Sequence, residues 1–218
     1  YEFKSAVLSV PGGGVPAFLL ESASFGPLVK ASLLAGADAN FQAFLGEYAV
    51  TNQLPVEQAL IPAYLAFDAL LTDAQRAEIN ALFADFVYAA QTVYDSADPN
   101  NFAALLGSNT PVLVHEVVGG GTNDDASIGL PDQVIPNNTV TSPSFAGTDP
   151  LARFIGLQKV SSSTEGSGLV RFTAGSHSSI AVPAPSLAAT TEMQRQMIAF
   201  LASGGNNIVI TDTSVIEN

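Results

Sequence analysis

The sequence predicts an α/β fold with a mostly parallel sheet and one helical insertion. Strand-like apolar runs occupy Phe3–Val10, Pro111–Val118 and Leu169–Thr173. Between the first two runs, roughly Gly36–Gly107 has helical spacing and almost no β signal, and Thr191–Ser203 is an amphipathic helix pattern. Strands separated by long connections that contain helices typically pair in parallel.

The composition bounds the class of protein. The chain has 218 residues and is 47% hydrophobic, enough for one domain or for one domain with an insertion. Seven Lys and Arg against twenty Asp and Glu give a net charge of −13, which argues against nucleic acid or an anionic membrane surface as partners. No run of about 18 apolar residues predicts a transmembrane span. The absence of cysteine excludes disulfides and a thiolate nucleophile.

The N-terminal region is predicted to contain one strand followed by short helices. Phe3–Val10 is typical of a buried strand, and Pro11 with three glycines ends it. The glycine spacing matches no dinucleotide-binding pattern and no P-loop lysine follows, so a plain turn is expected there. Pro16–Gly46 is apolar and interrupted by proline and glycine, which favours short helices.

Two long helices are predicted in the middle of the chain. Val56–Leu71 has apolar residues at helical spacing, and Pro62 is expected to kink or split this helix. Thr72 and Gln75 form a capping-box pattern. The helix that it opens is expected to be the longest, with one apolar stripe from Ile79 to Val93.

The character of the sequence changes near Thr110. Before it, Asp98 and Pro99 fit the N-cap and first residue of a short helix that Gly107 is expected to end. After it, Pro111–Val118 is rich in β-branched residues and is typical of a buried parallel strand.

The C-terminal third is predicted to alternate helices and strands. Pro150–Gly156 favours a short helix, and Ile208–Thr211 favours a last edge strand. Thr191 and Gln194 predict a capping box for the final helix. Its inward residues are expected to be Met193, Met197, Ile198 and Leu201.

An aspartate and a histidine follow two of the predicted strands. In parallel sheets, reactive groups gather beyond the carboxyl ends of the strands. Asp132 lies in a tight Leu-Pro-Asp turn, whereas Asp124 and Asp125 lie in an open polar stretch. Asp132 followed by His177 matches the last two members of the order Ser…Asp…His. In such a triad the imidazole takes the serine proton and the carboxylate fixes its tautomer.

Several segments carry a more specific resemblance. PVLVHEVVGGG with LPDQVIPN, then VRFTAGSHSSI and TTEMQRQMIAFLASGG, resemble the extracellular bacterial lipases of the Pla-1/cef type, which are α/β-hydrolases. FKSAVLSVPGGGVPAFLLESASFGP resembles the strand and loop that follow the nucleophile-elbow helix in that family. The resemblance implies an α/β-hydrolase core formed by residues 1–35 and 108–218, with residues 36–107 as an inserted helical lid.

The resemblance also implies an activity and its residues. The family is one of lipases and lysophospholipases, secreted or held at the bacterial cell surface, that need no cofactor or metal. Asp132 would be the triad acid and His177 the triad base. The sequence departs from the family because no G-x-S-x-G is present. The chain is therefore expected to be a C-terminal portion that is inactive alone, with the serine on an upstream half or a companion chain, and dimerisation is a further expectation.

Other interpretations remain open at the level of sequence. The same scaffold could serve an esterase or acyltransferase of another substrate class, or a binding or scaffold module without activity. His115 and Glu116 are adjacent in a strand and so face opposite sides, which argues against a metal pair. Asn123, Asp124 and Asp125 offer oxygen ligands for Ca²⁺, but their spacing fits no EF-hand, and no metal site is predicted.

Overall fold

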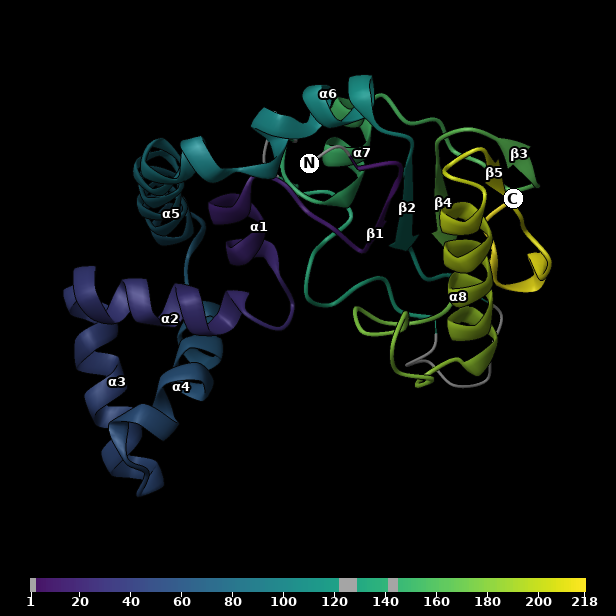
Figure 1. Ribbon diagram of the computed structural model, residues 1–218. Coiled ribbons are helices and arrows are strands. Elements are labelled where there is room, and N and C mark those ends of the chain that lie inside the picture. The colour runs from purple at the N-terminus through teal and green to yellow at the C-terminus, as the bar shows by residue number, and fades with distance from the viewer. Residues whose placement is uncertain (1–2, 122–128, 141–144) are drawn as a thin grey trace.

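The computed structural model describes residues 3–121, 129–140 and 145–218, and a three-stranded parallel sheet forms its centre (Figure 1). In the register, Ser9 lies opposite His115 and Val117 lies opposite Phe172. The strands lie in the order β1-β2-β4, with bounds β1 (Ala6–Ser9), β2 (Val112–Val117) and β4 (Gly168–Phe172). The predicted mixed α/β class and its parallel sheet are therefore confirmed.

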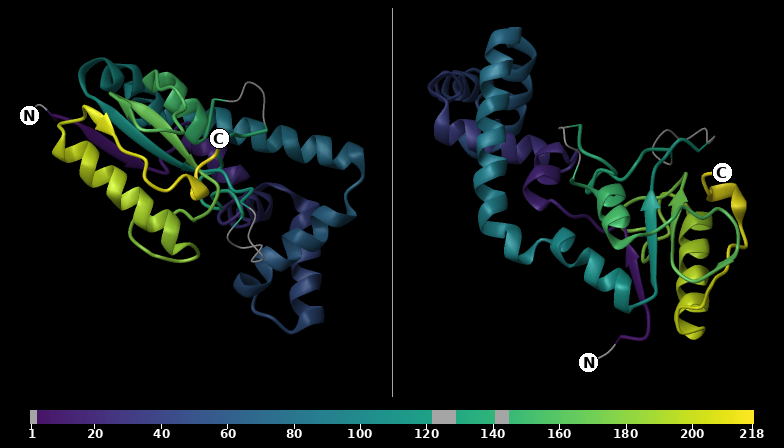
Figure 2. Two further views of the ribbon diagram at one scale, coloured as in Figure 1. Left: turned by 90° about the vertical axis from the view of Figure 1, so that its right-hand side faces the viewer. Right: turned by 90° about the horizontal axis from the view of Figure 1, so that it is seen from above.

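Helices cover both faces of this sheet (Figure 2). On one face, α8 (Leu187–Ala202) packs Met193 and Phe200 against alternate side chains of β2 and β4. On the other face lie α6 (Pro99–Asn109) and α7 (Thr148–Ile155). Because side chains alternate along a strand, β2 contributes buried residues to both layers, and all six of its residues are buried.

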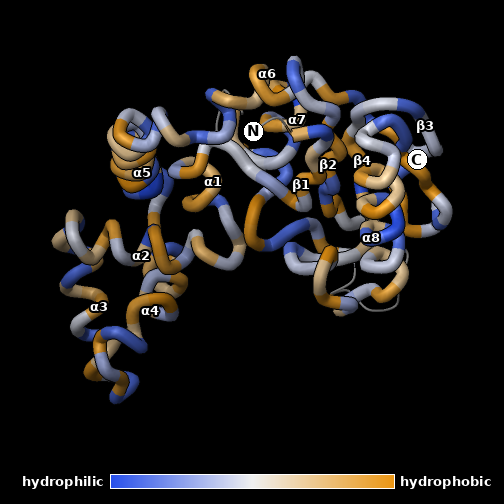
Figure 3. Tube along the Cα trace, viewed as in Figure 1, coloured by the Kyte–Doolittle hydropathy of each residue, from blue (hydrophilic) through white to orange (hydrophobic). Residues whose placement is uncertain are grey.

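Four further helices form a separate layer beside the sheet, which we call the helical block (Figure 1). They are α2 (Gly26–Ala37), α3 (Ala39–Asn52), α4 (Val56–Leu70) and α5 (Asp73–Tyr94). Hydrophobic and hydrophilic residues alternate along them (Figure 3), and the apolar sides share one core. In that core the Phe41 ring packs edge-on against Phe67, with centroids 5.3 Å apart.

The junction between the helical block and the sheet is organised by Asp98, which is 1% exposed. Its carboxylate accepts hydrogen bonds from the amides of Gly14 and Val15 at the start of α1 (Val15–Glu21). It also caps α6 through the Asn100 amide and accepts from Gln91 of α5. One carboxylate therefore ties together the start of α1, α5 and the start of α6.

Two predicted features of the helical region have clear outcomes. Thr72 and Gln75 form the predicted capping box, and the 22-residue α5 that follows is the longest helix in the described part of the chain. Pro62 lies inside α4 without splitting it, because Ala59, Ala63 and Tyr64 are buried in the shared core of the block.

Gly107 does not end α6, which continues to Asn109. The glycine instead permits close helix packing, since a Cβ at this position would lie 2.0 Å from the Ile155 carbonyl oxygen of α7.

The predicted start of the last helix is wrong. α8 begins at Leu187, because the Ser186 side chain caps it by accepting from the Ala189 amide. Met193 is buried as expected, but Ile198 and Leu201 are largely exposed. After α8, β5 (Asn207–Ile208) pairs antiparallel with β3 (Thr164–Glu165) in a separate two-stranded sheet.

The core of the helical block also draws on residues before position 36. Leu20 of α1 and Ala31 and Leu34 of α2 are buried in it. The predicted division at residues 35/36 and 107/108 stays a prediction.

No described helix is both long enough and apolar enough to cross a membrane by itself. Only the pair α1 and α2, bent by 100° at its break, meets the criteria when taken together.

Candidate active site

Asp132 is held at the carboxyl end of β2. Its amide donates to the Val117 carbonyl at 3.0 Å, which brings the chain back to the end of β2. Its Oδ1 accepts from the Val134 amide at 2.8 Å. The side chain is fully buried. Backbone contacts before and after Asp132 therefore fix where its carboxylate points.

His177 lies in a tight turn beyond the end of β4. Gly175 has a φ of 126°, a backbone conformation that L side chains rarely adopt, and a Cβ there would lie 3.0 Å from Ser179 Oγ. The fully buried Ser179 accepts from the Ser176 amide at 2.7 Å, and its own amide donates to the Ser176 carbonyl. The Gly-Ser-His-Ser-Ser sequence thus forms a closed turn that projects the imidazole.

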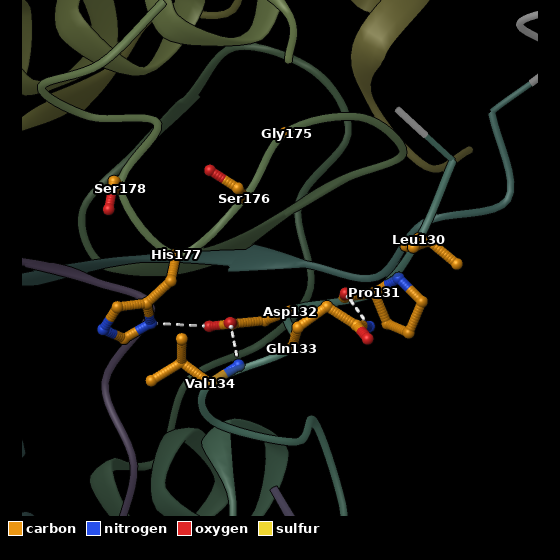
Figure 4. A pocket seen from close by; sticks show the side chains of 9 residues that line it. All are labelled: Leu130, Pro131, Asp132, Gln133, Val134, Gly175, Ser176, His177 and Ser178. Atoms are coloured by element: carbon orange, nitrogen blue, oxygen red, sulfur yellow. Dashed lines mark hydrogen bonds and ion pairs between the residues drawn. The ribbon is translucent and has the colours of Figure 1, made fainter. Parts of the chain in front are cut away.

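The two loops bring the predicted pair into direct contact. His177 Nδ1 lies 2.8 Å from Asp132 Oδ2, although 45 residues separate them in sequence (Figure 4). The imidazole is 35% exposed, whereas the carboxylate is fully buried. A pocket of about 200 Å³ lies between the loops, lined by residues 130–134 and 175–178. One partner is therefore fixed inside the protein and the other is open to the pocket.

This geometry assigns a tautomer to the neutral imidazole. A carboxylate only accepts hydrogen bonds, so the Nδ1 proton is donated to Asp132 and Nε2 keeps a free lone pair. Nε2 points away from Asp132 (Figure 4) and has no hydrogen-bond partner among the described residues. A histidine in this state can accept a proton at Nε2 while the carboxylate stabilises the resulting cation.

No described serine occupies the position next to Nε2. Ser176 Oγ lies near Ser179 Oγ and the Ala184 carbonyl, at 3.5 and 3.4 Å. Ser178 borders the pocket, but no hydrogen bond joins it to His177. Within residues 3–121, 129–140 and 145–218, no serine hydroxyl therefore forms a hydrogen bond with His177.

His115 and Glu116 face opposite sides of the sheet, as the strand pattern predicts. The His115 ring packs edge-on against Phe172, 5.4 Å between centroids, and neither ring nitrogen has a hydrogen-bond partner among the described residues. Burial lowers the pKa of His115 to about 4; Gln196 and Glu192 on α8 oppose this shift. A neutral, fully buried imidazole of this kind has a structural role in the core.

Glu116 belongs to a cluster of charged side chains on the α7 face. Arg171 Nε lies 2.8 Å from Glu116 Oε2, and its Nη1 lies 2.7 Å from Glu217. Asp149 of α7 lies 3.9 Å from the same guanidinium. Burial, assisted by the charge of Asp149 and opposed by Arg171, raises the pKa of Glu116 to about 8. This cluster joins β2, β4, α7 and the C-terminal segment.

The remaining candidates from the sequence are a possible Ca²⁺ site and the glycines after the first strand. Asn123, Asp124 and Asp125 lie outside the described residues. In the described ranges, no three side chains of His, Cys, Asp or Glu lie in an arrangement that could hold a metal ion. Gly13 pairs with Gly147 in an isolated bridge, and Gly14 precedes α1, so these glycines serve the junction.

Sequence reasoning missed two groups of residues that build the site. Ser179 closes the turn of His177, and the run of serines around the histidine was the available signal. Ser22 and Ser24, more than 100 residues away, donate to the Gln133 carbonyl next to Asp132. No local pattern indicates a contact at such a sequence separation.

Comparison with known proteins adds no relative. No family model, no curated protein and no solved structure matches this chain at the level searched. The resemblance to Pla-1/cef lipases therefore stays a prediction, and the case for function depends on the residues and geometry of the site.

Proposed function

We propose that this chain supplies the acid and base of a serine-type carboxylic ester hydrolase, of the lipase or lysophospholipase class, on an α/β-hydrolase scaffold. The observation that carries the proposal is the 2.8 Å contact between His177 Nδ1 and Asp132, made from loops at the carboxyl ends of neighbouring parallel strands. The sequence order Asp then His and the free Nε2 support the same assignment.

The chemistry requires a serine hydroxyl beside Nε2. His177 takes its proton as the serine oxygen attacks the ester carbonyl, and Asp132 stabilises the imidazolium through Nδ1. The proton then passes from Nε2 to the leaving alcohol, which leaves an acyl-serine. Water, activated by the same nitrogen, attacks this acyl group, and the carboxylic acid and free serine are released.

The serine is proposed to lie on a segment that pairs with the open edge of β1. The amides of Ala6 and Val10 donate to β2, so the alternating pattern directs those of Val7 and Ser9 away from it. Among the described strands, β1 has no neighbour on that edge. An unpaired edge is a template for another strand. A parallel strand there would end on the same side of the sheet as Asp132 and His177.

The proposal extends to the setting of the enzyme. A secreted or cell-surface location and a lipid or other ester substrate follow from the resemblance to Pla-1/cef lipases, as does a lid role for the helical block. The strongest competing function is a binding or scaffold module, in which the Asp132–His177 contact has no catalytic use. An esterase or acyltransferase of another substrate class would share the same triad.

A serine-directed phosphonate tests the proposal. The purified material is treated with the reagent, and the intact mass of every polypeptide present is then measured. Label on a co-purifying chain, or on the upstream segment once it is restored, is the expected result. A restored protein that takes no label and hydrolyses no ester would exclude the hydrolase and favour the binding module.

The chain contains a matched pair of histidine variants for the restored enzyme. His177→Ala is expected to lower kcat by about 10⁴-fold or more, because the serine then lacks its base. His115→Leu removes the other histidine, which lies in the core, and is expected to leave kcat within a few fold. An unchanged rate in His177→Ala would remove this residue from the mechanism.

A further inference from the structure

One peptide unit links the turn between α1 and α2 to the Asp132 carboxylate. The carbonyl oxygen of Gln133 accepts two hydrogen bonds from that turn, one from Ser22 Oγ at 3.3 Å and one from the Ser24 amide at 2.9 Å. The amide of the same peptide unit belongs to Val134, and it donates to Asp132 Oδ1 at 2.8 Å. Asp132 is therefore oriented by a group whose other end is held by a distant element.

The planarity of the peptide bond makes this linkage rigid. The carbonyl of Gln133 and the amide of Val134 point in opposite directions and can only rotate together. Fixing the carbonyl thus fixes the direction from which Asp132 Oδ1 receives its hydrogen bond, while Oδ2 faces His177. Successive hydrogen bonds in such a chain also polarise one another.

Ser22 is built into its position. It is 2% exposed, its amide donates to the Phe18 carbonyl at 2.8 Å, and its Oγ also accepts from the Phe25 amide at 3.1 Å. Phe18 packs in the same hydrophobic cluster as Ile135, three residues after Asp132. The end of α1 and the loop of Asp132 are therefore one packed unit.

The same helix also packs against the helical block. Leu20 of α1 is buried in the core that α2 to α5 share, two residues before Ser22. A shift of the helical block therefore reaches Ser22 through a short and buried segment.

We propose that Ser22 is a positioning residue for the Asp132–His177 pair, and that α1 carries the position of the helical block to that pair. The inference rests on the proposed function, since it treats the pair as triad acid and base. Ser22 touches neither His177 nor a substrate; it acts on Asp132 through the peptide unit between Gln133 and Val134.

The 218-residue chain itself allows the test, because the readout is the hydrogen bonding of the pair. In Ser22→Ala, NMR is expected to detect about tenfold faster hydrogen exchange of the Val134 amide, the effect of losing one hydrogen bond in the relay. The low-field Nδ1 proton signal of His177 is expected to broaden. Ser22→Thr keeps a hydroxyl and is expected to restore both signals.

Ser108→Ala is the matched control. Its Oγ donates to a backbone carbonyl of α6 at 2.7 Å, so the substitution removes the same kind of hydrogen bond away from the relay. The Val134 and His177 signals are expected to be unchanged in this variant.

A purely structural role for Ser22 gives a different result. Ser22→Ala with a lower free energy of unfolding but wild-type signals at Val134 and His177 would overturn the proposal. If this variant does not fold, the scalar coupling across the hydrogen bond from the Ser24 amide to the Gln133 carbonyl decides in the wild-type chain, and its absence overturns the proposal. A response at the pair combined with no phosphonate label on the restored protein would instead reject the hydrolase and retain the positioning role.

Discussion

The sheet and the helical block bury different kinds of side chain. The buried side chains at the core of the helical block are apolar, apart from the hydroxyl of Tyr64. The sheet buries His115 and Glu116 on β2, and α8 adds Glu192 and Gln196 from one side. Buried polar groups need specific partners, whereas apolar packing requires only matching shape. The part of the molecule that carries the candidate site is thus the part with the more demanding interactions.

The largest expected effect comes from removing the cation of the α7-face cluster. Arg171→Met leaves the fully buried Glu116 and its neighbours Asp149 and Glu217 without their guanidinium. We expect a loss of about 3 kcal/mol in the free energy of unfolding, because the variant removes two hydrogen bonds that the guanidinium donates, one to Glu116 and one to Glu217. Urea denaturation followed by circular dichroism measures it.

The helical block provides the matched control. Arg76 forms an ion pair with Asp68 at 2.6 Å, but both side chains are about 40% exposed. Arg76→Met is expected to cost less than about 1 kcal/mol, because solvent screens an exposed pair. Equal losses for the two arginine variants would contradict the contrast between the regions.

The same cluster should make stability depend on pH. Burial raises the pKa of Glu116 from 4.5 to about 8, so the folded protein holds this proton more tightly than the unfolded chain does. The corresponding stabilisation is complete below pH 4.5 and is lost as the pH rises through about 8. Glu116→Gln is expected to reduce this loss, which urea titrations at about pH 5 and about pH 9 can compare. If Glu116→Gln loses as much stability between these two pH values as the wild type does, Glu116 is ionised throughout.

The two regions also differ in how far the sequence predicts them. The capping box of Thr72 and Gln75 lies within four residues, so the start of α5 was predictable. The start of α8 was not predicted, because the pattern at Thr191 and Gln194 indicated a cap inside the helix, whereas the observed cap is Ser186. The positions of Asp132 and His177 beyond the ends of two neighbouring strands were predictable, whereas their catalytic roles stay a prediction. The contact from Ser22 to the loop of Asp132 spans more than 100 residues of sequence and follows only from the packed structure.

Asp98→Asn tests how strongly the two regions are joined. Burial raises the pKa of Asp98, but hydrogen bonds from Gly14, Asn100, Gln91 and Val15 outweigh it and lower the pKa overall. In asparagine an NH2 group replaces one of the two accepting oxygens, so it would face N–H groups that also donate. We expect the free energy of unfolding to fall by about 2 kcal/mol, which is the contribution typical of a hydrogen bond to a charged group. Hydrogen exchange should accelerate at the amides of Gly14 and Val15; protection equal to the wild type would contradict the assigned junction.

The smallest expected effect on the free energy of unfolding is that of His115→Leu, and this effect is expected to change with pH. The His115 ring is fully buried without a hydrogen-bond partner among the described residues, so replacing it by an apolar group of similar size is expected to change stability by less than about 1 kcal/mol near neutral pH. The lowered pKa, about 4, means that stability is lost as the pH falls from 6.5 through 4, because the unfolded chain takes up the proton first. Relative to the wild type, the leucine variant should therefore have a higher free energy of unfolding at about pH 5 than at neutral pH, which urea titrations measure. A loss above about 2 kcal/mol at neutral pH would indicate that buried water bonds the ring, and would make His115 a necessary polar member of the sheet core.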